Sequence, residues 1–189
     1  KPVLQLFRSA LCWRLSGGRL TVRVYGAGEL VPALECFSAV ANGTAQMGHD
    51  GAYYHTGKSE GSAFFTAFPF GFTADEMQAW VMYGNGQQLW DELYAPFGIR
   101  GFLAGSTGTQ MLGWFKREIR SLSDLEGLKF RAPGNQGRVL QKLGVTPVSL
   151  AGGDIYPALQ SGAIDGAEWI GPYNDLALGF YQVCKYYYA

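Results

Sequence analysis

Two segments decide the fold: LKFRAPG at residues 128–134 and IDGAEWIGP at residues 164–172. In the first, strand alternation places the side chain of Arg131 on the face opposite Phe130, at the end of the run and just before a Pro-Gly break. In the second, Glu168 comes late in an apolar run that also stops at a Gly-Pro break. Ligands collect at the carboxyl ends of strands in open α/β sheets, so both charged side chains are predicted to face one such edge.

The pairing of these two charges has two interpretations that spacing alone leaves open. In the first, Arg131 and Glu168 form a buried ion pair or each cap a neighbouring backbone group. In the second, they flank a ligand. In the second case the planar guanidinium of Arg131 binds a carboxylate. Glu168 would repel that carboxylate, so it lies on the far side or holds a cation that bridges the two anions. Such a cation takes oxygen ligands, and Gln110 is a candidate to supply one.

The rest of the chain alternates extended and helical segments, which predicts an α/β protein with a largely parallel sheet. Pro, Gly, Thr and Asp residues at the expected ends place the boundaries. Extended segments are predicted at 20–25, 99–105, 110–116, 128–131, 145–150 and 164–170. Helices are predicted at 32–41, 136–143, 155–161 and 174–184, with two more within 73–94 and a capped turn at 123–126.

Composition narrows the function classes. Hydrophobic residues make up 48% of the 189 residues and charged residues 16%, as in a globular protein. Fifteen basic residues balance fifteen acidic ones, and no basic run occurs, so a nucleic-acid partner is not expected. No apolar stretch reaches the roughly 18 residues that a membrane helix needs.

Most familiar site motifs are absent from the sequence. Gly26-Ala27-Gly28 lacks the third glycine of a dinucleotide-binding loop, and neither a Walker loop nor GxSxG occurs. The group His49, Asp50 and His55 makes at most an incomplete metal site. The three scattered cysteines indicate neither a zinc site nor a disulfide framework.

The sequence resembles the periplasmic solute-binding proteins of TRAP (tripartite ATP-independent periplasmic) transporters, and in particular the branch that binds 2-oxo acids such as pyruvate. The resemblance covers the chain from about residue 16 to its end. Many stretches match in the same order along the chain, which is more specific than any single motif. The matching stretches are 16–25, 28–35, 64–67, 69–71, 92–98, 125–131, 150–159, 164–173 and 185–188.

This resemblance implies a fold and a domain organisation. The family fold is of the periplasmic-binding-protein type: α/β, with two lobes, mixed but mostly parallel sheets and a ligand cleft between the lobes. Residues 1–105 are expected to form lobe I, with 172–189 returning to it, and residues 106–171 are expected to form lobe II.

The resemblance also implies roles for individual residues. Arg131 is similar to the arginine that binds the substrate carboxylate. Gln110, Glu168 and the backbone at Trp169 resemble the group that holds a metal ion, which in turn contacts the substrate. That ion is sodium in the 2-oxo-acid branch, while calcium shares the same oxygen ligands. Tyr53 and Tyr54 match a tyrosine pair near the cleft; the substrate-binding set is therefore Arg131, Gln110, Trp169, Tyr53 and Tyr54.

The function expected from the resemblance is capture of a small 2-oxo monocarboxylate in the periplasm and its delivery to the membrane permease subunits of the transporter. The full-length family proteins use C-terminal helices for homodimers. Catalysis is not expected; the alternative is a metal-assisted enzyme acting on a 2-oxo acid, with Glu168 as general base. A further alternative is that the chain binds nothing and the charged pair only joins its two halves.

Three features depart from the family pattern. Residues 1–15 do not resemble the family's N-terminal region. The chain stops after Tyr188-Ala189, before the segments that complete the family's sheets, so a fragment is expected. Asp50 stands where small residues are more usual. The side-chain length of the ligand and the identity of the ion are not fixed by the sequence.

Overall fold

The structure is a computed structural model that describes residues 11–189. Its contacts group the chain into two compact units, with the division between Gly48 and His49. The lobe boundary at 105/106 stays a prediction. Within residues 11–189, no helix has both the length and the apolar character that crossing a membrane requires.

In the described part of the first unit, residues 11–15 are helical, and η1 (Ala33–Glu35) with α2 (Cys36–Ala41) forms a second helical segment. It starts after Pro32, and Phe37 and Ala39 are its buried residues. The helix predicted at 32–41 is therefore confirmed. The strand predicted at 20–25 is wrong, because no described segment pairs with it and alternation alone does not hold a strand.

The second unit begins with a helical part. Its elements are η2 (Ala52–His55), η3 (Glu60–Phe65), α3 (Ala74–Tyr83), α4 (Gly86–Tyr94) and η4 (Ala95–Phe97). Thr73 caps α3 in a capping box: its hydroxyl accepts from the Glu76 N–H at 3.4 Å, and the Glu76 carboxylate accepts from the Thr73 N–H at 2.8 Å. The prediction of two helices rather than one within 73–94 is confirmed by the break at Gly84.

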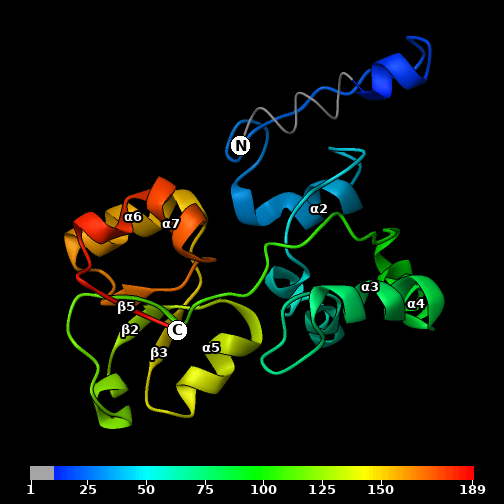
Figure 1. The fold of residues 1–189 in the computed structure, drawn as a ribbon. Helices are drawn as coiled ribbons and strands as arrows, with labels where there is room; N and C mark the ends of the chain where they lie inside the picture. The colour runs from blue at the N-terminus through cyan, green and yellow to red at the C-terminus, as the bar shows by residue number, and fades with distance from the viewer. Residues whose placement is uncertain (1–10) are drawn as a thin grey trace. The chain divides into compact units, whose positions relative to one another are not determined.

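A five-stranded mixed sheet forms the rest of this unit, in the order β3-β2-β4-β1-β5 (Figure 1). Its strands are β1 (Gly113–Phe115), β2 (Lys129–Arg131), β3 (Thr146–Val148), β4 (Gly166–Ala167) and β5 (Tyr186–Tyr188). β2 pairs in parallel with β3 and β4, whereas β1 runs antiparallel to β4 and β5. The predicted α/β fold with a mixed sheet is thus confirmed, with two parallel and two antiparallel pairings. β5 lies outside the predicted extended segments, and each of the other four strands is shorter than its predicted segment.

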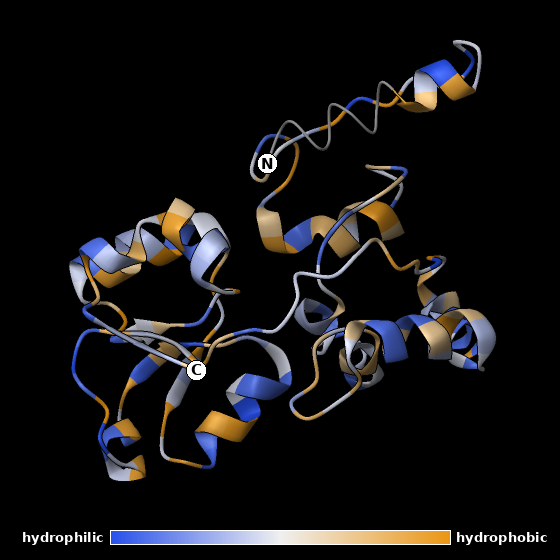
Figure 2. Ribbon diagram, viewed as in Figure 1, coloured by the Kyte–Doolittle hydropathy of each residue, from blue (hydrophilic) through white to orange (hydrophobic). Residues whose placement is uncertain are grey.

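Helices cover both faces of this sheet. They are α5 (Gly134–Gln141) on one face and α6 (Gly152–Ser161) with α7 (Pro172–Leu178) on the other, as Figure 1 shows, while η5 (Leu122–Leu125) and η6 (Phe180–Gln182) lie in the connections. Alternate strand residues feed two cores: Phe115 and Phe130 pack with Leu140 of α5, and Ala167 packs with Ile155 of α6. Hydrophobic and hydrophilic residues alternate around α5 in Figure 2, as expected for a helix that covers a sheet.

Two further predictions differ from the structure. Residues 99–105 form no strand, because no described neighbour pairs with them. The helix predicted at 174–184 breaks at Gly179, which ends α7 in the left-handed conformation at φ 74°. Beyond this break, Phe180 and Cys184 are buried in the core of the sheet. The return of residues 172–189 to lobe I, which the resemblance implies, stays a prediction.

Candidate functional site

Arg131 and Glu168 lie side by side at the carboxyl ends of two parallel strands. Arg131 is the last residue of β2 and pairs in register with Ala167, the last residue of β4. Glu168 follows directly, and its backbone N–H donates to the carbonyl oxygen of Arg131 at 3.1 Å. The parallel pairing therefore brings both charges to one edge, as the two sequence segments predict.

The guanidinium of Arg131 is buried and almost fully hydrogen-bonded. Its side chain is 1% exposed and forms an ion pair with the carboxylate of Glu168. Nη1 also donates to the Glu168 carbonyl oxygen at 3.2 Å, Nε to the Leu150 carbonyl oxygen at 3.2 Å, and Nη2 to the Tyr54 hydroxyl at 2.7 Å. The ring of Trp169 lies 5.1 Å from the guanidinium carbon, within the range of a cation–π contact.

Of the two interpretations of this pair, the structure has the direct ion pair. The pair still leaves binding capacity unused. A guanidinium has five N–H donors, and four are used here, so one N–H of Nη2 remains. Among the described residues only Oε1 of Glu168 has a side-chain hydrogen bond, so Oε2 keeps its lone pairs for another partner.

Burial changes the protonation behaviour of this group. It raises the pKa of Glu168 to about 7, the charge of Asp175 acts in the same direction, and Arg131 opposes the change. Burial also raises the pKa of Tyr53 far above its usual value, with Tyr54 and Glu168 adding to the effect, so this phenol stays neutral.

The two tyrosines reach the strand ends from η2. Their rings meet edge to face with centroids 4.6 Å apart. Gly134, at the start of α5, has φ +63°, and a Cβ added there would lie 2.8 Å from the Cβ of Tyr53. A glycine at this position therefore allows Tyr53 to approach the edge of the sheet.

A small cavity of about 20 Å³ joins these elements. It is lined by Tyr53, Ala67, Gln110, Pro133, Gln136 and Glu168. Such a volume holds one or two waters, or one ion. Arg131 does not line it, because Tyr54, Glu168 and Trp169 surround the guanidinium. A small organic acid needs side-chain movement to reach Arg131.

All six predicted site residues thus belong to one cluster, but sequence reasoning missed two others. Gln136 lines the cavity from α5. It lies five residues after Arg131, so the argument that placed Arg131 at the strand end could also have found it. Asp175 of α7 is fully buried and holds the loop that follows Glu168. An acid in the first turn of a helix is common, so no sequence signal set it apart.

The oxygen-rich donor set at the cavity fits a hard cation. Gln110 and Glu168 both line it, and amide and carboxylate oxygens are ligands that sodium and calcium take. Trp169, whose backbone is the third predicted ligand, is not among the lining residues. Within residues 11–189 no group of three His, Cys, Asp or Glu side chains could hold a metal.

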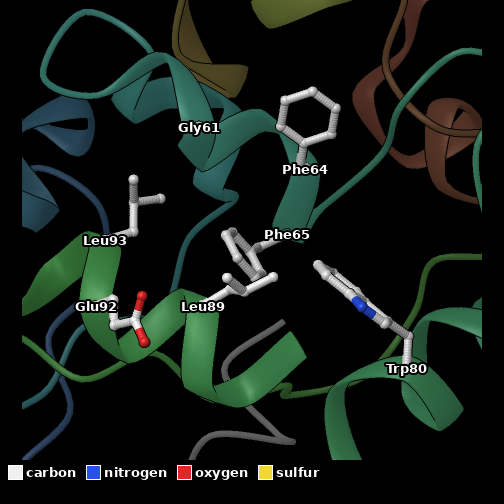
Figure 3. Close-up of a pocket in the computed structure, with 7 residues that line it drawn as sticks. All are labelled: Gly61, Phe64, Phe65, Trp80, Leu89, Glu92 and Leu93. Carbon is white, nitrogen blue, oxygen red and sulfur yellow. The ribbon is translucent and has the colours of Figure 1, made fainter. Parts of the chain in front are cut away.

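A larger hollow of about 510 Å³ lies elsewhere in the same unit (Figure 3). It is lined by Gly61, Phe64, Phe65, Trp80, Leu89, Glu92 and Leu93. Figure 3 shows mainly apolar side chains around it, with Glu92 as the exception. It lacks the convergent polar groups that orient a small acid, so it is not the candidate site despite its size.

Of the group His49, Asp50 and His55, which the sequence gives as at most an incomplete metal site, Asp50 and His55 are in contact. Nε2 of His55 lies 3.0 Å from Oδ1 of Asp50, and His55 is buried. Asp50, which stands where small residues are more usual, thus pairs with a histidine and does not line the small cavity.

Comparison with known families gives a match over nearly the whole chain. The model of the family described as bacterial extracellular solute-binding protein, family 7 (DctP), matches residues 5–189. It therefore includes most of residues 1–15, which are expected from the sequence to depart from the family pattern. A curated relative from Nostoc sp. (strain PCC 7120), named a monocarboxylate 2-oxoacid-binding periplasmic protein, is 49% identical over 92% of this chain and 48% of its own length.

Solved structures of TRAP solute-binding proteins have the same fold. One from Bordetella bronchiseptica RB50, a dimer with calcium and picolinate, has a TM-score of 0.92 and 44% identity over 97% of this chain and 56% of its own. One from Pseudoalteromonas atlantica T6c, with sodium and pyruvate, has a TM-score of 0.92 and 45% identity over 96% of this chain and 55% of its own. One from Colwellia psychrerythraea, with calcium and pyruvate, has a TM-score of 0.90 and 45% identity over 95% of this chain and 55% of its own. The chain spans about half the length of these relatives.

Proposed function

Because this chain belongs to the bacterial extracellular solute-binding proteins of family 7, we propose that it binds a small 2-oxo monocarboxylate such as pyruvate together with a metal ion, in the periplasm. It then serves the membrane subunits of a TRAP-type transporter as their receptor and carries out no reaction. The full protein forms homodimers. We also propose the two lobes predicted above, with residues 1–105 and 172–189 in lobe I and residues 106–171 in lobe II.

One observation carries this proposal: Arg131 and Glu168 are fixed at one edge of the sheet, each with unused binding capacity. The remaining N–H of Arg131 Nη2 is a charge-assisted donor for a carboxylate. Tyr54 holds the same nitrogen, so a bound carboxylate takes a place beside the tyrosine hydroxyl or displaces it. Tyr53 and Trp169 then supply an aromatic wall, and their movement admits the ligand.

The metal is held by the side chains of Gln110 and Glu168 and by the backbone carbonyl of Trp169. Its chemistry is electrostatic, because a cation between two anions removes their repulsion. Glu168 supplies Oε2, which has no other partner among the described residues. Sodium or calcium accompanies pyruvate in two of the similar structures, which supports a cation of this hard type.

Equilibrium dialysis of the 189-residue chain tests the proposal. The chain is dialysed at pH 8 against a mixture of 2-oxo and 2-hydroxy acids, in sodium, in calcium, and in choline with EDTA. We expect pyruvate or a close 2-oxo acid to be retained only with a metal ion. Retention of no acid under any condition contradicts the proposal.

A second measurement distinguishes a receptor from an enzyme. The chain is incubated with pyruvate and divalent metal ions, and the solution is followed by NMR. A receptor returns pyruvate unchanged. Sustained formation of a product would instead assign Glu168 the part of a general base.

A further inference from the structure

Asp175 is a fully buried carboxylate whose partners are all neutral. Its Oδ1 accepts from the backbone N–H groups of Ile170 at 3.0 Å and Gly171 at 3.1 Å. Its Oδ2 accepts from Nε1 of Trp114 at 3.0 Å and from the Tyr187 hydroxyl at 3.0 Å. No described cationic side chain forms an ion pair with it. Its negative charge is therefore solvated by dipoles but not neutralised.

The hydrogen bond from Ile170 to Asp175 also fixes the direction in which the Trp169 carbonyl points. The N–H of Ile170 and the carbonyl of Trp169 belong to the same peptide group. That group is planar and trans, so its N–H and its carbonyl point in opposite directions. By holding the N–H, Asp175 turns the Trp169 oxygen away from itself. On the other side of the loop, the Ile170 carbonyl accepts from the N–H of Met111 at 2.9 Å, next to Gln110.

The buried charges around the site do not balance. At pH 8, where Glu168 is ionised, Arg131 is the one buried Arg or Lys among residues 11–189, against the carboxylates of Glu168 and Asp175, and all three are at most 3% exposed. Buried charge without a counter-charge is costly, so the cluster favours a bound cation. A monocarboxylate ligand adds a second excess negative charge. A divalent ion balances both charges, whereas a monovalent ion balances one.

We propose that Asp175 is a positioning residue of the cation site, which orients the Trp169 carbonyl oxygen and adds the charge that makes calcium the preferred ion over sodium. The inference rests on the proposed function, because it assumes the cation held by Gln110, Glu168 and Trp169. The charge of Asp175 acts on an ion in proportion to the ion's own charge. Its removal therefore weakens calcium binding by about the square of the factor for sodium, whereas a change that only lowers the fraction of folded chain, and leaves the groups around the ion as they are, weakens both ions by the same factor.

The variant Asp175→Asn removes the charge, and its amide oxygen can still accept from Ile170 and Gly171. Its NH2 group then faces Nε1 of Trp114 and cannot accept that hydrogen bond, so a loss of stability is expected beside the electrostatic effect. Calcium and sodium affinities are measured by calorimetry at pH 8 in the presence of pyruvate, and thermal unfolding in EDTA checks the fold of each variant. We expect a loss of about 10-fold for sodium and about 100-fold for calcium, the scale of changes behind metal ligands. The control is Asp165→Asn, whose carboxylate accepts the Lys129 N–H at 2.9 Å near the other end of the strands; we expect it to keep the calcium-to-sodium ratio.

A second variant keeps the inference testable if Asp175→Asn does not fold. Asp175→Glu retains the charge but moves the carboxylate, so both ions should bind more weakly by the same factor. Equal losses for both ions in Asp175→Asn, no loss in either variant, or a changed ratio in Asp175→Glu overturns the inference. If the unaltered chain binds neither ion with pyruvate, the proposed function itself fails and this inference fails with it.

Discussion

Arg131 and Glu168 are linked through both backbone and side chain. The N–H of Glu168 donates to the Arg131 carbonyl oxygen at 3.1 Å, while Nη1 of Arg131 donates to the Glu168 carbonyl oxygen at 3.2 Å and to its carboxylate. The strand pairing and the ion pair thus hold the same two residues. Since both are buried, removal of either side chain leaves the other without its counter-charge.

Arg131→Ala is expected to destabilise the chain by about 3–5 kcal/mol, because it leaves the carboxylate of Glu168 buried and unpaired. Urea unfolding at pH 8 measures this change. The matched control is Arg138→Ala, on α5. Its ion pair with Glu60 at 2.8 Å joins two exposed side chains, so its loss should cost about 0–1 kcal/mol. Equal losses in the two variants would argue against an energetic role for burial.

Glu168→Gln is expected to make the affinity for pyruvate independent of the metal ion. Glutamine has nearly the same shape but no charge, so it leaves the cation with a neutral ligand and Arg131 with no counter-ion. Calorimetry with pyruvate in sodium, in calcium and in choline should give one weak affinity in all three. The exposed Glu60→Gln is the control and should keep the metal dependence. A Glu168→Gln chain that still needs metal contradicts the assignment.

The stability of the metal-free chain should fall as pH rises from about 5 to 8. Burial raises the pKa of Glu168 in the folded state to about 7, above its value of about 4.5 in an unfolded chain. Between these values the folded state binds more protons than the unfolded state, so the free energy of unfolding decreases with pH. Urea unfolding in EDTA at several pH values tests this, and Glu168→Gln should flatten the dependence. A free energy of unfolding that rises in this window only in the unaltered chain would contradict a raised pKa of Glu168.

Gly152→Ala should weaken pyruvate binding through Trp169. A Cβ at Gly152 would lie 2.5 Å from the Trp169 ring, which must then move away from Arg131. The neighbouring Gly153→Ala is a close control, because its Cβ would meet nothing within 4 Å in the same helix. That change should stabilise α6 by about 0.5–1 kcal/mol and leave the affinity unaltered. The dissociation constants of the two variants decide the matter, and equal values would exclude a role for the Trp169 ring.

The sequence predicts the parts of the site that depend on strand ends. Alternation and the Pro-Gly and Gly-Pro breaks place Arg131 and Glu168 correctly, because side chains alternate along a strand and parallel strands end together. Whether the two side chains touch depends on their rotamers, which spacing does not encode. The missed Asp175 shows a similar limit, since its partners Trp114 and Tyr187 come from distant strands.

Long-range strand pairing also explains the errors in the predicted fold. Residues 20–25 alternate as a strand should, yet a strand forms only where a neighbour offers its backbone groups. By contrast, the helices within 73–94 depend on local signals, the Thr73 cap and the Gly84 break, and the sequence predicts them correctly.

The position of Trp169 has a practical consequence. Its indole lies 5.1 Å from the guanidinium carbon of Arg131, so the chromophore is next to the charges that a ligand would rearrange. Its absorption and fluorescence are sensitive to a change in that local field. The chain therefore carries its own optical reporter, and occupancy is expected to be readable in real time without a dye or a radioactive tracer.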